Sequence, residues 1–218
     1  MVGKSQMRQR IRAWEKELLE KTGQRLSQFG FSPRARGQAF PLPIDGGRAA
    51  VHLSFIEHEA DVDVTIDVAV RFDAVEDLVN SFCTLLSQAE KAQTYTLGAE
   101  LGNLEGEGQF RLSITSRSDI EPVAERLVAK VERVGLPYIE RYSQPEVAYS
   151  VLSKDEPEVW IHSPFHDARA KRACAFLVIL NRWSELPSLA ARKRAFLESV
   201  GDPGIAAFDR FLANLEAS

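Results

Sequence analysis

The clearest candidate for chemistry in this sequence is a row of charged residues within one alternating stretch. Asp61, Asp63 and Asp67 stand between apolar residues, and Arg71 follows further along. Alternate side chains of an extended strand point to the same face, so these four would share one face. Carboxylates presented together can bind a basic partner, because complementary charge speeds encounter and excludes wrong partners. The plainer alternative is a solvated sheet face on which Arg71 pairs with a carboxylate.

A second group of polar residues surrounds His58, which has Glu57, Glu59, Asp61 and Asp63 close by in the sequence. An imidazole and carboxylates can bind a divalent cation or transfer protons. The same segment is predicted to be the turn between two strands, and exposed turns are commonly acidic. The sequence therefore favours a plain acidic turn, and we predict no metal site and no cofactor.

A third group contains His162, His166 and Arg169. Two histidines four residues apart on one helix could bind a metal. Pro164 lies between them, however, and a continuous helix does not accommodate a proline there. We therefore keep the three residues only as the lining of an alternative pocket for a small ligand or substrate, between the sheet and the C-terminal helices.

Other motifs give little support for catalysis. The glycine-rich segment 98–108 carries glutamates and is followed by a predicted strand, whereas a phosphate loop needs positive charge and a following helix. No serine stands in a G-x-S-x-G context. We therefore assign no catalytic residue and lean against an enzyme, without settling the point.

The element that must position the charged row is the stretch Val62–Phe72, in which apolar and mostly polar residues alternate without a break. This pattern predicts a strand of an antiparallel sheet with one face on a core and the other open to solvent. The expected fold class is α+β, an antiparallel sheet of about five strands packed against helices. The other strands are expected at 38–42, the proline-containing edge, and at 49–57, 94–100 and 109–115.

Helices are expected on both sides of these strands in the sequence. Asp73 with Glu76, and Ser118 with Glu121, have the spacing of capping boxes that begin two of them. From residue 143 the chain is predicted to be helical apart from a short extended piece at 158–162. We therefore expect an α+β domain at 1–142 and a C-terminal helical subdomain at 143–218 packed on it. The main helices are expected at 5–28, 73–89, 118–134, 166–183 and 186–200, with a last helix after 203.

The charge of the chain is distributed unevenly. The net charge of −4 combines +6 over residues 1–48, −12 over 49–163 and +2 over 164–218. The acidic middle disfavours nucleic acid and would attract a basic protein. The basic start is expected to be the solvated face of a helix. The longest apolar run has eight residues, far fewer than a membrane span needs, and the first residues lack the apolar core of a signal peptide, so we expect a cytoplasmic protein that does not enter the membrane.

These elements together resemble a set of bacterial proteins of unknown function. In those proteins a leading helix ends in a phrase like Leu26-Ser-Gln-Phe-Gly-Phe31, an aromatic-containing strand like Gln38-Ala-Phe40 follows, and a β-meander and a capped helix come next. The resemblance covers about residues 10–90. Some of these proteins are similar to immunity proteins, and they supply no catalytic residues. The resemblance therefore implies a helix–meander–helix core and an inhibitor or immunity-like role. Partner binding is expected at Asp61, Asp63, Asp67 and Arg71 because of their shared strand face, and not because of the resemblance.

Overall fold

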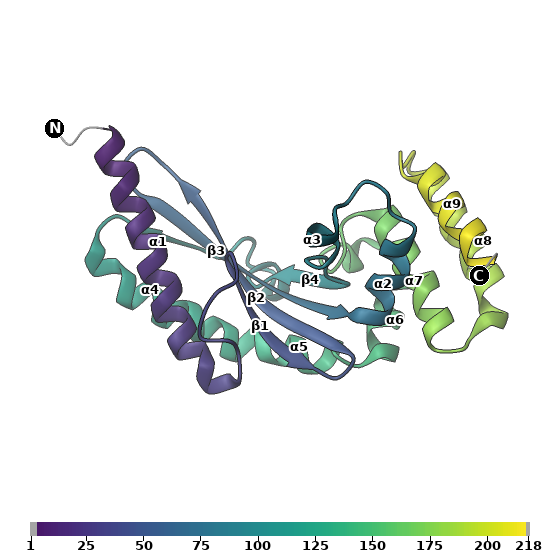
Figure 1. Ribbon diagram of the computed structural model, residues 1–218, viewed down its shortest axis with the longest axis horizontal. Coiled ribbons are helices and arrows are strands. Elements are labelled where there is room, and N and C mark those ends of the chain that lie inside the picture. The colour runs from purple at the N-terminus through teal and green to yellow at the C-terminus, as the bar shows by residue number, and fades with distance from the viewer. Residues whose placement is uncertain (1–3, 217–218) are drawn as a thin grey trace. The chain divides into compact units, whose positions relative to one another are not determined.

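The alternating stretch of the sequence forms a strand in the middle of the sheet. In the computed structural model, which describes residues 4–216, strand β3 spans Val62–Phe72 (Figure 1). Its six alternate apolar side chains are all buried, with at most 5% of any of them exposed. The predicted apolar face is confirmed, and the fold is α+β with an antiparallel sheet and C-terminal helices.

The described part of the chain forms a sheet of five antiparallel strands. β1 is followed by β2 and then β3, and both β4 and β5 pair with β3. β5 pairs with the beginning of β3, which places Asp63 opposite Ser113 and Thr65 opposite Arg111. β1, which contains the prolines, lies at the edge as predicted, where a missing N–H disturbs no ladder. The strands are β1 (Ala39–Ile44), β2 (Gly47–Glu57), β3 (Val62–Phe72), β4 (Leu97–Glu100) and β5 (Arg111–Ile114).

Two long helices, α1 (Lys4–Leu26) and α4 (Ile120–Lys130), pack against each other (Figure 1). Each has an amphipathic pattern whose apolar side chains are buried. α1 runs into a 3-10 turn, η1 (Ser27–Phe29), and ends at Gly30, whose φ of 87° is left-handed. A glycine adopts this conformation without strain, so Gly30 ends the helix that was expected at 5–28.

The segment after α4 does not end where the sequence predicted. The helix expected at 118–134 does not end there, because a π-helical turn, η4 (Val131–Gly135), leads directly into α5 (Leu136–Tyr142). Pro137 is the second residue of α5 and directly follows this π-helical turn, where the regular i→i−4 hydrogen-bond pattern is already interrupted, so its missing N–H does not end the helix. Gly135 is buried and packs close to Val131 and Leu101, so it allows a close approach and does not end the helix.

The helices of the second half bury most of the longest apolar run of the sequence, residues 173–180. Residues 173–177 of α7 are at most 1% exposed. α7 packs against α2, α6, α8 and α9. The helices are α2 (Asp73–Ser81), α3 (Gln88–Lys91), α6 (Pro145–Leu152), α7 (His166–Ile179), α8 (Leu186–Ser199) and α9 (Ile205–Glu216), and the 3-10 turns are η2 (Asn103–Glu105), η3 (Arg117–Asp119), η5 (Pro157–Val159) and η6 (Trp183–Glu185).

Four local predictions were wrong. α2 ends at Ser81, eight residues before the expected end, and the expected extended piece at 158–162 contains the 3-10 turn η5. Neither predicted capping box forms, because α2 has no side-chain cap and the second box is made by Ser116 and Asp119, two residues earlier. The Glu76 side chain has an ion-pair partner on α7 instead of a capping role.

The chain divides into two compact units. The first contains residues 1–44, 48–69 and 99–140, and the second contains 45–47, 70–98 and 141–218. The expected boundary at 142 therefore describes only part of this division, because α2 packs on α7 and so groups residues 70–98 with the C-terminal helices. No helix in the described range combines the length and apolar character that crossing a membrane requires.

Candidate functional site

The polar positions of β3 do not form one open acidic face. Asp63, Thr65 and Arg71 are buried, with 8%, 3% and 4% exposed, whereas Asp67 is half-buried. The expectation of a face open to solvent is therefore wrong at these three buried positions. Asp63 and Arg71 have charged and hydrogen-bonding partners inside the protein, which offset the cost of removing a charge from water.

Asp63 accepts hydrogen bonds from a neighbouring strand. The Ser113 hydroxyl donates to its Oδ1 over 2.5 Å, a contact that follows from the β3–β5 register. Its Oδ2 lies 3.2 Å from His58 Nε2 and 3.5 Å from Arg111 Nη1. The hydrogen bond from Ser113, opposed by burial and aided by the charges of His58 and Arg111, lowers the pKa of the Asp63 carboxyl. Asp63 is therefore a fixed, ionised carboxylate at the start of β3.

His58, Asp61 and Asp63 converge at the turn between β2 and β3. Each offers one donor atom, and these three atoms lie within 4.8 Å of one another. The turn is closed by a hydrogen bond of 2.9 Å from the His58 backbone N–H to the Asp61 carbonyl, which holds the two ends of the turn together. His58 is exposed, Asp61 half-buried and Asp63 buried, so the donors lie between solvent and the protein interior. One imidazole nitrogen and two carboxylates are a donor set that can bind a metal ion.

Asp67 lies near a histidine and a serine without forming a catalytic relay. Its Oδ2 is 3.8 Å from His52 Nδ1, and the Ser54 hydroxyl is 3.4 Å from that same nitrogen. In a Ser–His–Asp relay the serine and the aspartate face opposite ring nitrogens, so that one proton is taken while the other is held. Here both face Nδ1, and the three residues are therefore polar, half-buried neighbours on the sheet face.

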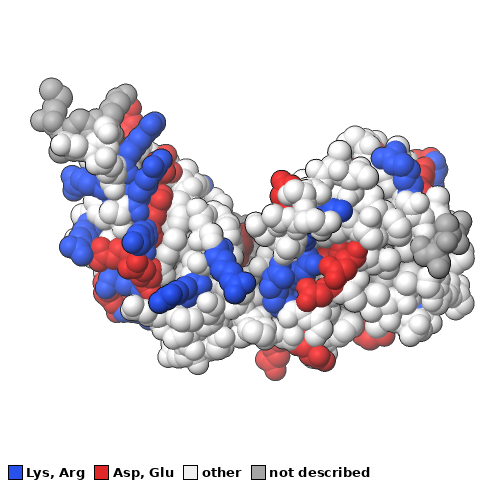
Figure 2. Space-filling model, in the orientation of Figure 1, with Lys and Arg blue, Asp and Glu red and all other residues white. Residues whose placement is uncertain are grey.

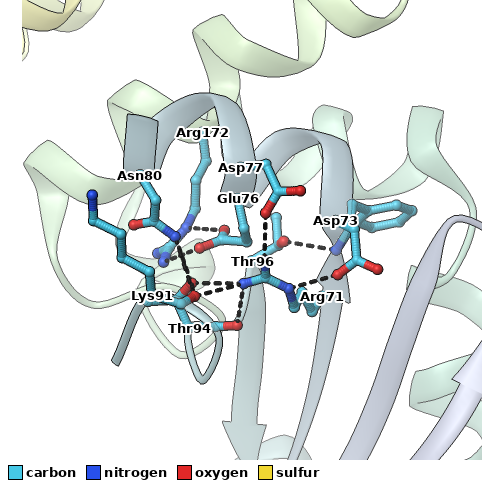
Figure 3. Close-up of polar contacts among 10 residues, drawn as sticks. Arg71, Asp73, Glu76, Asp77, Asn80, Lys91, Thr94, Thr96 and Arg172 are labelled. Carbon is cyan, nitrogen blue, oxygen red and sulfur yellow. Dashed lines mark hydrogen bonds and ion pairs between the residues drawn. The ribbon is translucent and has the colours of Figure 1, made fainter. Parts of the chain in front are cut away.

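Arg71 organises a buried network in the second unit, shown in Figure 3. Its Nε donates to Asp73 over 2.6 Å and its Nη2 donates to Asp77 over 2.8 Å. Its Nη1 donates to the Thr94 hydroxyl and to the carbonyls of Thr94 and Lys91. The guanidinium therefore ties the loop before β4 to the first turns of α2, and it pairs with carboxylates as the plainer alternative predicted.

Glu76 is the fully buried carboxylate next to this network, and sequence reasoning misread it as a capping residue. Arg172 of α7 donates to both of its oxygens, over 2.7 and 3.3 Å (Figure 3). Burial raises its pKa, but the charge and hydrogen bonds of Arg172, together with hydrogen bonds from Thr94 and Thr96, outweigh burial and leave the pKa lowered. The signal available in the sequence was an acidic residue among the apolar residues of an amphipathic helix.

The structure brings together two of the three residues of the alternative pocket. Arg169 Nη2 lies 2.9 Å from His166 Nδ1, and Arg169 Nη1 donates to the Ser163 carbonyl over 2.6 Å. His162 packs against the Tyr142 ring, with the ring centroids 5.0 Å apart. Burial, together with the charge of nearby Arg141, lowers the pKa of His162 to about 4. Both Arg169 and His162 are buried, so they act first as structural residues of the second unit.

Sequence reasoning missed a charged cluster around Asp155 in the second unit. Lys193 Nζ donates to Asp155 Oδ1 over 2.6 Å, and Arg169 Nη2 lies 3.8 Å from the same oxygen. The side chains of both cations are at most 1% exposed, so two buried cations share one carboxylate. Lys193 could have been noticed from its position on the apolar stripe of α8, between Leu189 and Leu197.

Basic side chains gather along α1, as Figure 2 shows, with acidic residues among them. Arg8, Arg10, Arg12 and Lys16 are all exposed, and Lys16 lies 3.9 Å from Glu20 one turn later. The prediction that the basic start of the chain is an exposed face of a helix is confirmed.

Comparison with protein-family models, curated proteins and solved structures returned no match for this chain.

Proposed function

We propose that this chain is a non-catalytic protein-interaction module of the cytosol, an inhibitor or immunity-like protein, that binds a basic protein partner through carboxylates of its first unit. The proposed surface, here called the acidic surface, is formed by Glu57 at the end of β2, Glu59 and Asp61 in the turn between β2 and β3, and Asp67 within β3. Glu57 and Glu59 are exposed and the two aspartates are half-buried. Asp63 and Arg71 are buried and have partners within the protein, so we do not propose that they contact the partner protein.

The grouping of these four carboxylates at the solvent-accessible surface carries this proposal, and a repulsion between like charges supports it. The pKa of Glu15 on α1 is raised by burial and by the charge of Glu57. The nearby Arg12 lowers that pKa but does not cancel the effect. The negative charge of Glu15 and Glu57 is therefore incompletely neutralised within the protein. A lysine or arginine from a partner would reduce the repulsion between these carboxylates.

The distribution of charge along the chain supports a protein partner over nucleic acid. Residues 49–163, which contain the acidic surface, have a net charge of −12. A phosphate backbone would be repelled there, whereas a basic protein would be attracted over several ångströms and oriented by the charges. The resemblance to immunity-like proteins fits this type of partner, since charge complementarity provides both speed and selectivity.

The test compares two charge-reversal variants with the same change in net charge. Glu57→Lys/Asp67→Lys alters the acidic surface, and Glu132→Lys/Glu140→Lys alters two exposed glutamates elsewhere on the first unit. Immobilised wild-type protein should capture a basic protein from a lysate, with capture falling as salt rises. The first variant should lose at least about tenfold in association rate, and the second should keep it.

Both variants must show the wild-type circular dichroism spectrum and melting temperature before capture is compared. Equal loss in the two variants would point to net charge alone and would contradict a defined surface. Capture of proteins that are not basic, or capture that does not depend on salt, would also count against the proposal.

A further inference from the structure

We propose that His58, Asp61 and Asp63 form a binding site for a divalent transition-metal ion, with zinc and manganese as the expected class. The inference stands apart from the proposed function, because it needs no protein partner. It rests on three side chains at the turn between β2 and β3 whose donor atoms lie within 4.8 Å of one another.

The separation of the two best-placed donors suits a shared ion. His58 Nε2 and Asp63 Oδ2 are 3.2 Å apart. Two ligands that are each about 2.1 Å from one metal, at a tetrahedral or octahedral angle, lie about 3.0–3.4 Å apart. An ion could therefore replace the present hydrogen bond with little movement of either side chain. Asp61, at the other end of the same turn, supplies the third donor.

The buried ligand is already oriented by a neighbour. The Ser113 hydroxyl donates to Asp63 Oδ1 over 2.5 Å, which leaves Oδ2 directed at His58. Hydrogen bonds of this kind to a ligating carboxylate fix its direction and are a regular part of metal sites. The strand register places Asp63 opposite the exposed Ser113, so this support follows from the pairing of β3 with β5.

The donor types indicate the class of ion. Calcium and magnesium prefer sites made only of oxygen atoms, whereas an imidazole nitrogen suits zinc and other transition metals. Three protein ligands leave coordination positions for water, as in sites of the open type. Glu57 and Glu59, both exposed and next to His58, add negative charge that would attract a cation to the turn.

One cation in the structure competes with the proposed ion. Arg111 Nη1 lies 3.5 Å from Asp63 Oδ2, and its Nη2 donates to Gln109 over 2.7 Å. The Arg111 side chain is 44% exposed, so it can move into solvent when an ion binds. Removing its charge should therefore strengthen metal binding, an effect that a purely structural role for these residues does not produce.

The test is calorimetric titration of the full chain with zinc, manganese, calcium or magnesium chloride at about pH 7.5, where a free imidazole is mostly neutral. We expect one zinc or manganese ion per chain, bound at least about tenfold more tightly than calcium or magnesium. His58→Ala and Asp61→Asn should each weaken binding at least about tenfold, and Arg111→Gln should tighten it several-fold.

His52→Ala is the matched control, because the side chains of His52 and His58 are both 44% exposed and each lies beside an aspartate. His52, which lies beside Asp67, is outside the three-donor group. This variant should bind zinc as the wild type does. Wild-type protein without a bound zinc or manganese ion at millimolar concentration would overturn the proposal. So would binding that survives His58→Ala, or binding that His52→Ala abolishes. Melting curves recorded with and without zinc check that each variant folds, and zinc should raise the wild-type melting temperature.

Discussion

Glu76 of α2 and Arg172 of α7 form an ion pair with two hydrogen bonds in the second unit, although they are 96 residues apart in the sequence. The Glu76 side chain is fully buried, and 16% of the Arg172 side chain is exposed. A buried carboxylate is tolerated only when its charge is balanced and its oxygens are hydrogen-bonded. This pair therefore couples the position of α2 to that of α7.

Replacing Arg172 with alanine should destabilise the protein strongly, because it leaves the buried Glu76 charge without a cation. We expect a loss of about 3–5 kcal/mol in the free energy of unfolding at pH 7, measured by urea denaturation. The double variant Arg172→Ala/Glu76→Gln removes the unbalanced charge and should recover part of the loss. A loss below about 1 kcal/mol in the single variant would contradict the importance of the pair.

The sheet was predictable from the sequence because its signal is local. Alternation over Val62–Phe72 fixes the face of every side chain, and the structure buries all six apolar positions. The end of α2 was not predictable, because the apolar pattern continues past Ser81. Phe82 leaves the helix and packs on Phe211 of α9, with the ring centroids 6.0 Å apart. Such a contact between distant parts of the chain overrides local periodicity.

The candidate site was predictable in composition but not in geometry. The sequence placed Asp63 on a polar face and His58 beside it, yet it could not give Ser113 as a partner. That contact depends on the register between β3 and β5, which alternation within a single strand does not specify. The burial of Arg71 likewise depends on Asp73, Asp77 and the loop that contains Thr94.

Arg71→Lys should loosen the loop before β4 while keeping the positive charge. A lysine cannot reproduce the three directions in which the guanidinium donates, so the carbonyls of Lys91 and Thr94 lose a buried donor. We expect about 1–3 kcal/mol of destabilisation in urea unfolding. Hydrogen exchange should become faster at the Thr96 amide, which donates to the Val70 carbonyl.

The more exposed of the two carboxylate partners of Arg71, Asp77, provides the control for this prediction. The Asp77 side chain is 73% exposed, so Asp77→Asn should change stability by less than about 1 kcal/mol. If Arg71→Lys were as mild as Asp77→Asn, the network would contribute little to the loop, and its description as a structural link would be wrong.

Stability should fall as the pH is lowered from about 6.5 to about 4, because of His162. Its pKa in the folded protein is lowered from 6.5 to about 4 by burial and by Arg141. Between these values the unfolded chain binds a proton that the folded protein excludes, so acid favours unfolding in this window and adds no further loss from this group below it. The contribution is at most about 3 kcal/mol.

His162→Phe should flatten this part of the pH profile, since phenylalanine keeps a ring against Tyr142 and cannot bind a proton. The measurement is urea unfolding at several pH values between about 4 and 7.5, for both proteins. Carboxylates with lowered pKa, such as Glu76, lose their stabilising effect at more acidic pH and should affect the two proteins equally. Parallel profiles over the whole range would refute the assignment to His162.

Asp155→Asn should be among the most damaging single substitutions in the second unit. Lys193 and Arg169 are both buried, and Asp155 is the carboxylate that they share. Burial lowers the pKa of Lys193, and the hydrogen bond and charge of Asp155 oppose that effect. The lysine also donates to the Lys154 carbonyl over 2.9 Å, but Asp155 is the carboxylate that balances its charge. We expect a loss of about 3–5 kcal/mol in urea unfolding.

Lys193→Met is the informative comparison, because it keeps the apolar stem on α8 and removes the cation. Asp155 then retains Arg169 as its partner, and the cost should be less than about 1.5 kcal/mol. If Lys193→Met were as destabilising as Asp155→Asn, the lysine charge would itself be required, and the two cations would not be competing for one carboxylate.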